Sequence, residues 1–254
     1  MTSVLFDHPG PKARVRHRIT AAVSAALVLL ALWWALAQFK EKGNLAAAKW
    51  TPFLTADLWV NYLIPGLLNT LAAAAASIVL AGAFGLAFGM GRLSHVRAVR
   101  WVSTVIVEFF RSVPVLVMMF FAFNLYAHNG VFRSDLNPLA GVVTGLTLYN
   151  GAVVAELLRS GVGSLPKGQT EAGLAIGLSR GQTLRSVLLP QAITAMLPAL
   201  VSQLVVILKD TALGYLITYQ ELLNKFQQIA ALMEQQGTLI RHPVFPPQGS
   251  GKPN

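Results

Sequence analysis

The sequence predicts an all-α, multi-spanning helical membrane protein, and two observations carry this prediction. Of its 254 residues, 54% are apolar and only 12% are charged, whereas soluble domains usually carry ~25% charged residues. Five windows contain no Asp, Glu, Lys or Arg, and each is close to or longer than the roughly 20 residues that a helix needs to cross a bilayer. These windows are 19–39, 58–91, 112–132, 136–155 and 186–208.

The positive charge indicates topology and not a nucleic-acid surface. The net charge is +10, but the basic residues stand at the ends of the apolar windows and form no single stripe, so no nucleic-acid partner is expected. Cytoplasmic loops are enriched in Lys and Arg, and an excess of twelve basic residues over four therefore places the N-terminus in the cytoplasm. The twelve are Lys12, Arg14, Arg16, Arg18, Arg92, Arg97, Arg100, Arg111, Arg159, Lys167, Arg180 and Arg185, and the four are Lys40, Lys42, Lys49 and Arg133.

The first two windows differ in their expected role. Residues 1–18 are expected to form a disordered basic cytoplasmic arm. Residues 19–39 form an extra N-terminal span, because the run is too long for a signal-peptide core and no cleavage pattern follows it. The second span is dense in Ala and Gly, and the spacing Gly85-x-x-x-Gly89 predicts close packing against another helix in the bundle.

Prolines predict irregular helices further along the chain. Pro114 is expected to kink the third span, and Pro190 and Pro198 to bend the fifth. The fourth span contains several glycines suited to packing, and Gly161 and Gly163 suit its end.

A helical hairpin is expected between the fourth and fifth spans. Ser164 and Pro166 suit the start of a short helix, and Gly177 suits a left-handed cap at its end. Ser179-x-x-Gln182 matches a capping box and opens a second helix that leads into the fifth span. The small residues of the first helix, among them Ala172 and Gly173, allow close approach of another protein. The simpler alternative is an ordinary amphipathic interfacial helix.

This hairpin resembles the cytoplasmic EAA loop of ABC importer permeases. Glu171-Ala172-Gly173, then Gly177 and Val187-x-Leu189-Pro190, match the loop, although Gly173 stands where the family usually has a second alanine. Four further blocks resemble the polar amino-acid group of that family, in the same order along 62–218: GLLNTL (66–71), EFFRSVPVL (108–116), NGAVVAELLRSGVGSLPKGQTEAG (150–173) and VILKDTAL (206–213). The basic arm and the extra first span resemble its glutamate-type members.

The resemblance implies a fold, a function and a set of partners. The fold is a type I permease bundle over 62–218 with a cytoplasmic coupling helix in the loop 164–185, in a bacterial plasma (inner) membrane. The function is uptake of polar amino acids such as glutamate, aspartate or glutamine. The implied partners are two nucleotide-binding ATPase subunits, a second permease copy or paralogue, an extracytoplasmic amino-acid-binding protein and membrane lipid. In this reading Glu171, Ala172, Gly173, Gly177, Ser179 and Pro190 carry the contact with the ATPase.

The chain itself is not expected to be an enzyme. It has no Gly-x-x-x-x-Gly-Lys-Ser/Thr motif, so ATP is expected to be hydrolysed on the partner subunit, and no cofactor is expected on this chain. It has no cysteine, and its histidines are scattered, so no metal site is expected. An ion-coupled secondary transporter or channel remains the first alternative, and a membrane-bound enzyme or scaffold the second.

Charges in the apolar part form two candidate groups. Glu108 with Arg111 and Glu156 with Arg159 are spaced i,i+3, and they predict either local pairing at the membrane surface or an inter-helix ionic cluster that transmits loop motion. Lys209, Asp210 and Thr211 lie at the far end of the fifth span and face either the translocation path or the lipid head groups. Asn69, Thr70, Asn124 and Asn150 are candidates for pathway groups or interhelical hydrogen bonds.

The C-terminal region departs from the family pattern. Family members normally finish with another full span, whereas 219–254 is Gln-rich and then Pro- and Gly-rich. Residues 222–240 have some helical periodicity but are too polar for a membrane span. We expect 219–254 to be an atypical polar tail, truncated or disordered.

Overall fold

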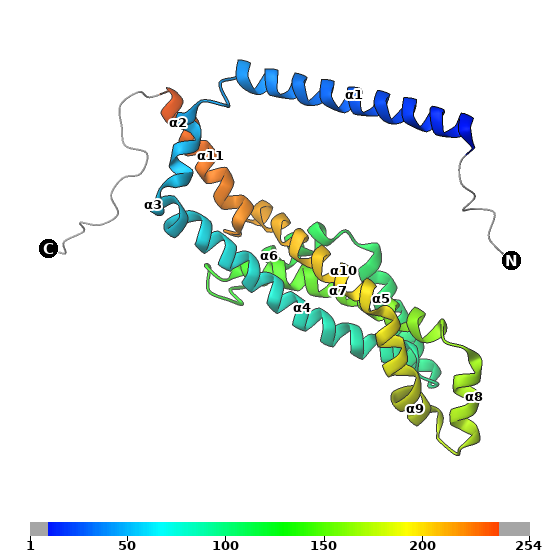
Figure 1. Cartoon of the computed structure of the whole chain (residues 1–254). Coiled ribbons are helices and arrows are strands. Elements are labelled where there is room, and N and C mark those ends of the chain that lie inside the picture. The colour runs from blue at the N-terminus through cyan, green and yellow to red at the C-terminus, as the bar shows by residue number, and fades with distance from the viewer. Residues whose placement is uncertain (1–9, 239–254) are drawn as a thin grey trace. The chain divides into compact units, whose positions relative to one another are not determined.

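The computed structural model describes residues 10–238, and within this range every regular element is a helix (Figure 1). The chain divides into two units, one up to Ala56 and one from Asp57 onward. Four helical stretches of the described range are long and apolar enough to cross a membrane: Lys12–Glu41, Ala56–Arg92, Asn137–Gly163 and Arg180–Ile217. A bent pair of shorter helices, Arg97–Ser112 and Val115–Asn129, passes the same test only when the two are taken together. The predicted all-α class is confirmed for the described range.

The first unit is dominated by α1 (Pro11–Glu41), which is followed by α2 (Ala47–Trp50) and a 3-10 turn, Thr51–Leu54. Helix α1 starts well before the predicted span, so the expectation that the whole arm 1–18 is disordered is wrong for residues 11–18. Pro11 at the first helical position suits a helix start, because its missing N–H has no helical partner there. Residues 1–9 lie outside the described range.

The core of the second unit is the pair of long helices α4 (Ile64–Arg92) and α7 (Asn137–Gly163), which run side by side (Figure 1). A Cβ on Gly85 would lie 2.4 Å from Val154 Cγ1, and one on Gly89 would lie 2.8 Å from Leu158 Cδ2. The glycine pair therefore provides the close packing that its spacing predicts. Helix α4 continues a helical run that begins with α3 (Ala56–Leu58) and a π-helical turn, Trp59–Leu63.

Helices α5 (Arg97–Ser112) and α6 (Val115–Asn129) replace the kinked third span that the sequence predicts. Their axes differ by 99°, so the chain breaks at Pro114 and does not merely bend. Val113 is extended, with φ −90° and ψ 128°, because the ring of a proline disfavours the helical conformation of the residue before it. Each arm is shorter than the ~20 residues needed to cross a bilayer.

Three helices follow α7 along the chain. They are α8 (Lys167–Ala175), α9 (Arg180–Thr183) and α10 (Leu189–Asp210), with a π-helical turn, Leu184–Leu188, between the last two. The π turn stands directly before Pro190, which cannot donate a helical hydrogen bond. The run remains helical through Pro198 and ends in a 3-10 helix, Thr211–Ile217.

The last element, α11 (Leu222–Thr238), corrects the expectation of disorder for this part of the tail. Glu221 is 1% exposed, and its two carboxylate oxygens each accept a 2.7 Å hydrogen bond, from Leu223 N and Asn224 N. Burial raises the pKa of the Glu221 carboxyl, and these two hydrogen bonds oppose the shift. The cap and the buried Ile229 hold α11 in place. Residues 239–254, the rest of the predicted tail, lie outside the described range.

Candidate functional site

The helical hairpin formed by α8 and α9 lies at one end of the second unit (Figure 1). Helix α7 ends at Gly163, and α8 begins after Pro166. Ser164 does not start α8 as predicted, because its Oγ donates back to the carbonyl of Gly161 at 2.8 Å and so closes α7. The hairpin is therefore joined to α7 by only a short turn.

The turn of the hairpin has the local chemistry that its sequence predicts. Gly177 has φ +85°, a left-handed conformation that glycine adopts without steric cost. The capping box is complete, since Gln182 N donates to Ser179 Oγ at 3.3 Å and Ser179 N donates to Gln182 Oε1 at 2.9 Å. These bonds give the tip a defined shape, with Ile176 77% exposed beside Gly177.

Gly173 serves the interior of the hairpin and not its outer surface. It is buried, and a Cβ at this position would lie 2.6 Å from Thr183 Cγ2 and 2.9 Å from Thr183 Oγ1. Glu171 and Ala172 are exposed, as is Pro190 at the start of α10. Of the residues predicted to meet a partner, Gly173 is thus a packing residue, while Glu171 and Ala172 remain accessible.

We expect Gly173→Ala to weaken the hairpin, because the new methyl group has no room beside Thr183. Overpacking of this kind costs about 1–3 kcal/mol, and limited proteolysis near Ile176 of the purified full-length chain will report it as faster cleavage. Adding Thr183→Ala removes both nearest atoms and should restore the wild-type rate. If the single and the double variant are cleaved equally fast, the contact is not what closes the hairpin.

An ionic cluster lies where α4, α5 and α7 meet; we define it as Arg92, Glu108, Arg111, Glu156 and Arg159. Within α7, Arg159 Nη2 donates to Glu156 Oε1 at 2.6 Å. Glu156 Oε2 also lies 2.7 Å from Arg92 Nη1 and 3.6 Å from Arg111 Nη1. Glu156 therefore contacts cations from all three helices, so the structure contains both the local i,i+3 pairs and ion pairs between helices. Transmission of loop motion by this cluster stays a prediction.

Arg92 is the centre of this cluster and the member that the sequence did not reveal. Its side chain is only 6% exposed, and its Nη2 donates to Glu108 Oε1 at 3.0 Å. From sequence, Arg92 is one more basic residue after an apolar window. The available signal was its place in the last turn of the glycine-rich helix. Arg92 lies seven residues after Gly85 and three after Gly89, so it shares their face of the helix. A face that packs against α7 carries Arg92 toward α7.

More than half of the chain matches a known protein family. The family model described as "binding-protein-dependent transport system inner membrane component" matches residues 81–241. This chain belongs to that family. The glutamate transport system permease protein GluD of Corynebacterium glutamicum is 51% identical over 190 residues, covering 75% of this chain and 70% of the relative. The probable glutamine ABC transporter permease protein GlnP of Bacillus subtilis is 39% identical over 168 residues, covering 66% and 76%.

Solved structures agree with the assignment. The crystal structure of an amino acid ABC transporter with histidines matches with a TM-score of 0.61 at 26% identity, covering 74% of this chain and 84% of that chain. The MetNI methionine ABC transporter in inward-facing conformations matches with a TM-score of 0.56 at 20% identity and shares the fold. The chain is a membrane-spanning ABC transporter permease, which decides against the secondary transporter, channel, enzyme and scaffold alternatives.

Lys209, Asp210 and Thr211 do not join the ionic cluster of this permease. Pro190 stands at the end of α10 that follows the hairpin, and Asp210 stands at the opposite end. At 1.5 Å per residue these two ends lie about 30 Å apart. The side chain of Lys209 is 79% exposed and its Nζ lies 3.8 Å from Asp210 Oδ1. Thr211 is buried and donates to the carbonyl of Leu208 at 2.7 Å. Their assignment to the translocation path stays a prediction.

The candidate polar groups of the spans make intramolecular hydrogen bonds. Asn69 Nδ2 donates to the carbonyl of Gln220 at 2.8 Å, and Leu222 N donates to Thr70 Oγ1 at 3.1 Å. Asn150 is fully buried, and its Oδ1 accepts a hydrogen bond from Gln203 of α10, a partner that sequence reasoning missed. Among residues 10–238, the hydrogen bond of the Asn124 side chain stays within its own helix, from Nδ2 to the carbonyl of Phe120. In this conformation the interhelical alternative therefore holds for Thr70 and Asn150, whereas Asn69 bonds to the loop that precedes α11.

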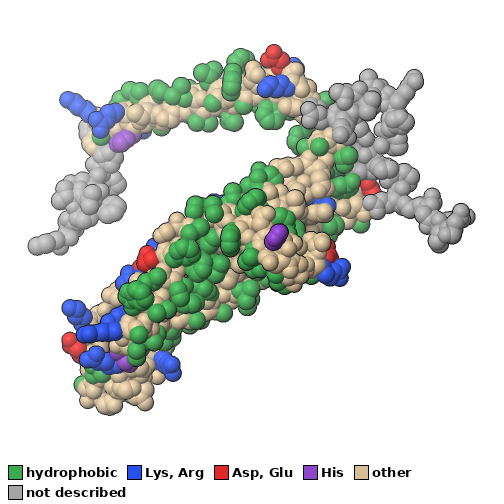
Figure 2. Space-filling model, turned by 180° about the vertical axis from the view of Figure 1, so that it is seen from behind, with side chains coloured by type: hydrophobic (Ala, Val, Ile, Leu, Met, Phe, Trp, Pro, Cys, Tyr) green, Lys and Arg blue, Asp and Glu red, His purple; other side chains and the backbone are tan. Residues whose placement is uncertain are grey.

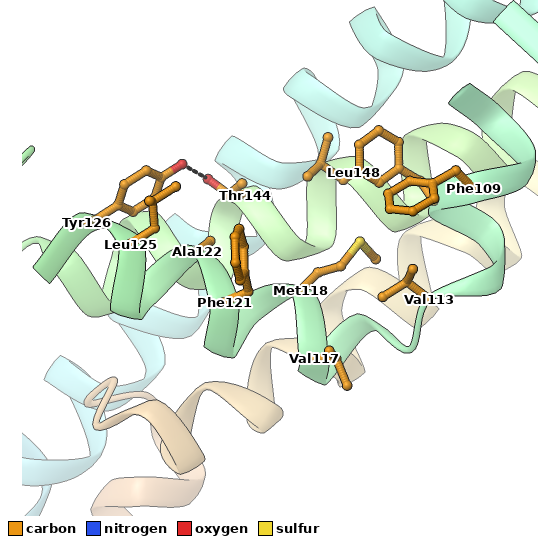
Figure 3. A pocket seen from close by; sticks show the side chains of 11 residues that line it. Phe109, Val113, Val117, Met118, Phe121, Ala122, Leu125, Tyr126, Thr144 and Leu148 are labelled. Atoms are coloured by element: carbon orange, nitrogen blue, oxygen red, sulfur yellow. Dashed lines mark hydrogen bonds between the residues drawn. The ribbon is translucent and has the colours of Figure 1, made fainter. Parts of the chain in front are cut away.

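The elbow between α5 and α6 encloses an apolar hollow of about 460 Å³ against α7 (Figure 3). Phe109, Met118 and Phe121 point into it, and its polar feature is the 2.9 Å hydrogen bond between the hydroxyls of Tyr126 and Thr144. A zwitterion placed in this hollow would lose its hydration without gaining a charged partner, which is costly. The elbow hollow is therefore unsuited to a polar amino acid.

Proposed function

We propose that this permease is the membrane-spanning subunit of an ATP-driven importer of polar amino acids, with glutamate or a close relative as substrate. The names of the relatives support this class, since they include glutamate and glutamine transport permeases. In this proposal ATP is bound and hydrolysed by separate subunits, a second permease copy or paralogue completes the pathway, and an extracytoplasmic binding protein delivers the amino acid. The N-terminus and the hairpin lie in the cytoplasm.

The observation that carries the mechanism is the position of the hairpin between two spanning helices. Force on α8 or α9 acts directly on α7 and, through the π turn, on α10. The ionic cluster links α7 to α4 and α5 through Glu156, about two helical turns before the end of α7. Closure of the ATPase pair would therefore move α4, α5, α7 and α10 together. In this proposal, ATP hydrolysis on the separate subunits reorients the spans through this movement. Glu171 and the exposed tip form the contact with the ATPase.

The docking contact is tested by co-purification of the tagged full-length permease with its ATPase subunits. We expect Glu171→Lys and Gly177→Trp each to abolish recovery of the ATPase, because one reverses an exposed charge and the other replaces a left-handed glycine at the tip. Asp135→Lys is the matched control, since it makes the same charge change in the exposed turn between α6 and α7. Full recovery with both hairpin variants would refute docking through this hairpin.

The orientation is tested by single cysteines, because the natural chain contains none. A cysteine at the exposed position 176 is expected to resist a membrane-impermeant maleimide in intact cells and to react after the cells are opened. A cysteine at position 135, in the turn before α7, is expected to react in intact cells. The reverse pattern would place the hairpin on the outer side and contradict both the topology and the docking proposal.

A further inference from the structure

A hollow of about 390 Å³ lies between the hairpin and the turn that joins α4 to α5; we call it the arginine hollow. Two cationic side chains from distant parts of the chain line it, Arg100 of α5 and Arg180 of α9, together with His95. None of its eleven lining residues is Asp or Glu. Figure 2 shows Lys and Arg side chains gathered at this end of the second unit.

The two arginines differ from those of the ionic cluster because neither makes an ion pair with a carboxylate in residues 10–238. Arg100 Nη1 donates to the carbonyl of Ser94 at 3.0 Å, a bond that holds the guanidinium at the rim and leaves its other donors available. Arg180 makes no side-chain hydrogen bond or ion pair with any residue between 10 and 238. Guanidinium groups are suited to bidentate contact with phosphate. Arg100 and Arg180 are exposed, and their guanidinium donors can therefore reach an anion from solution.

Five of the eleven residues that line the arginine hollow are apolar, and we call these five its floor; Ser94, Thr170 and Thr183 line it as well. The floor is formed by side chains from the α4–α5 turn, α7, α8 and the start of the fifth span, namely Leu93, Val162, Leu174, Leu184 and Leu188. A neighbouring hollow of about 660 Å³ shares Leu93, Ser94, His95 and Leu184 with it, adds Arg185 and is also lined by no Asp or Glu. A cationic rim over an apolar floor suits an amphiphile with an anionic head, and a small soluble anion would leave the floor unused.

We propose that the arginine hollow binds the phosphate of an anionic phospholipid, with Arg100 and Arg180 on the head group and the leucine floor against the glycerol and upper acyl carbons. Basic pockets at the cytoplasmic ends of membrane helices bind such head groups. A lipid seated here connects α5 with the hairpin and so restrains the element that the ATPase moves. The choice of leaflet, but not the binding itself, rests on the proposed orientation.

The test is lipid binding by the purified full-length permease, which needs neither an ATPase nor a transported substrate. In a neutral detergent, native mass spectrometry is used to compare added phosphatidylglycerol with phosphatidylcholine. Wild-type protein is expected to bind phosphatidylglycerol more tightly, and Arg100→Gln with Arg180→Gln to weaken that binding about tenfold. The matched control, Arg97→Gln with Lys167→Gln, removes the same charge from residues that line neither hollow, and it should bind as wild type does.

A second variant guards against a folding defect in the first. His95→Glu places a carboxylate at an exposed position of the rim and should also abolish the preference for phosphatidylglycerol. Equal loss in the control variant would overturn the proposal, because the preference would then reflect general surface charge. Displacement of the lipid by millimolar inorganic phosphate would also overturn it, in favour of a soluble anion. None of these results depends on transport, so they leave the proposed function to its own tests.

Discussion

Replacing Glu156 with methionine is expected to lower the free energy of unfolding of the permease by about 3 kcal/mol, because it leaves Arg92 buried with one carboxylate fewer. Arg92 is 6% exposed in its side chain, and Glu156 is its closer carboxylate at 2.7 Å. Glu108, at 3.0 Å, remains as a partner, so the loss lies at the lower end of the range for a broken buried pair. Thermal unfolding of the full-length chain in detergent measures it.

The matched control for this prediction is Arg159→Met, which removes the other close partner of Glu156. The side chain of Arg159 is 46% exposed, and exposed pairs contribute at most about 1 kcal/mol. If Glu156→Met and Arg159→Met cost the same, Arg92 is not the buried centre of the cluster. Arg92→Met combined with Glu156→Met should recover most of the stability, because an apolar pair replaces a buried ionic one.

The double variant also separates structure from coupling. If the ionic cluster transmits hairpin motion, the stable Arg92→Met, Glu156→Met permease is expected to assemble with its ATPase yet to hydrolyse ATP with little uptake. Uptake per ATP in proteoliposomes measures this ratio. A double variant that is stable and transports normally would reduce the cluster to a packing feature.

Gly85→Leu is expected to prevent α4 from packing on α7. It should lower the free energy of unfolding by about 3 kcal/mol, at the top of the range for overpacking, or prevent folding altogether. A Cβ at Gly85 would lie 2.4 Å from Val154 Cγ1 and 3.1 Å from the carbonyl oxygen of Gly151. The valine can be shortened by mutation, but the backbone oxygen belongs to a helix that cannot move without losing its other contacts. The yield of monodisperse protein and its Tm report the effect.

Gly82 is the matched control, because it lies one turn away on the same helix and a Cβ there would meet nothing within 4 Å. Gly82→Leu should change the free energy of unfolding by no more than about 0.5 kcal/mol. Gly85→Ala with Val154→Ala should be better tolerated than Gly85→Ala alone. Equal damage from leucine at Gly82 and Gly85 would mean that the α4–α7 contact does not set the requirement for glycine, since leucine is the better helix former at both positions.

Local features of the permease could be predicted from its residues because they depend on neighbours in the chain. The glycine at 177, the capping box of Ser179 and Gln182, and the end of α7 at Gly163 all follow from the conformations of a few adjacent residues. The break at Pro114 was placed correctly but its size was underestimated. A proline pattern locates an interruption, whereas the angle depends on what each arm then packs against.

Contacts between distant segments decided what the local patterns left open. In the sequence Gly173 suggests an open surface, but in the structure it packs against Thr183. In the sequence Arg92 is only a topology marker, but in the structure α5 and α7 each bring a carboxylate to it. The part of the tail from 222 to 238 looked disordered by composition, yet Glu221 caps it and hydrogen bonds to α4 hold its start. Composition cannot show a cap whose stability depends on a helix about 150 residues earlier.

By itself the sequence determined that this chain is a helical membrane protein, where its spans and hairpin lie, and which permease family its motifs resemble. These properties depend on hydropathy, turn chemistry and residue order, all of which act over short distances along the chain. The tertiary structure alone decided which arginine is buried, which glycine faces inward and where two guanidinium groups from distant segments share one hollow. Charge and volume have their effect through the atoms that surround them, and those atoms come from helices that only folding brings together.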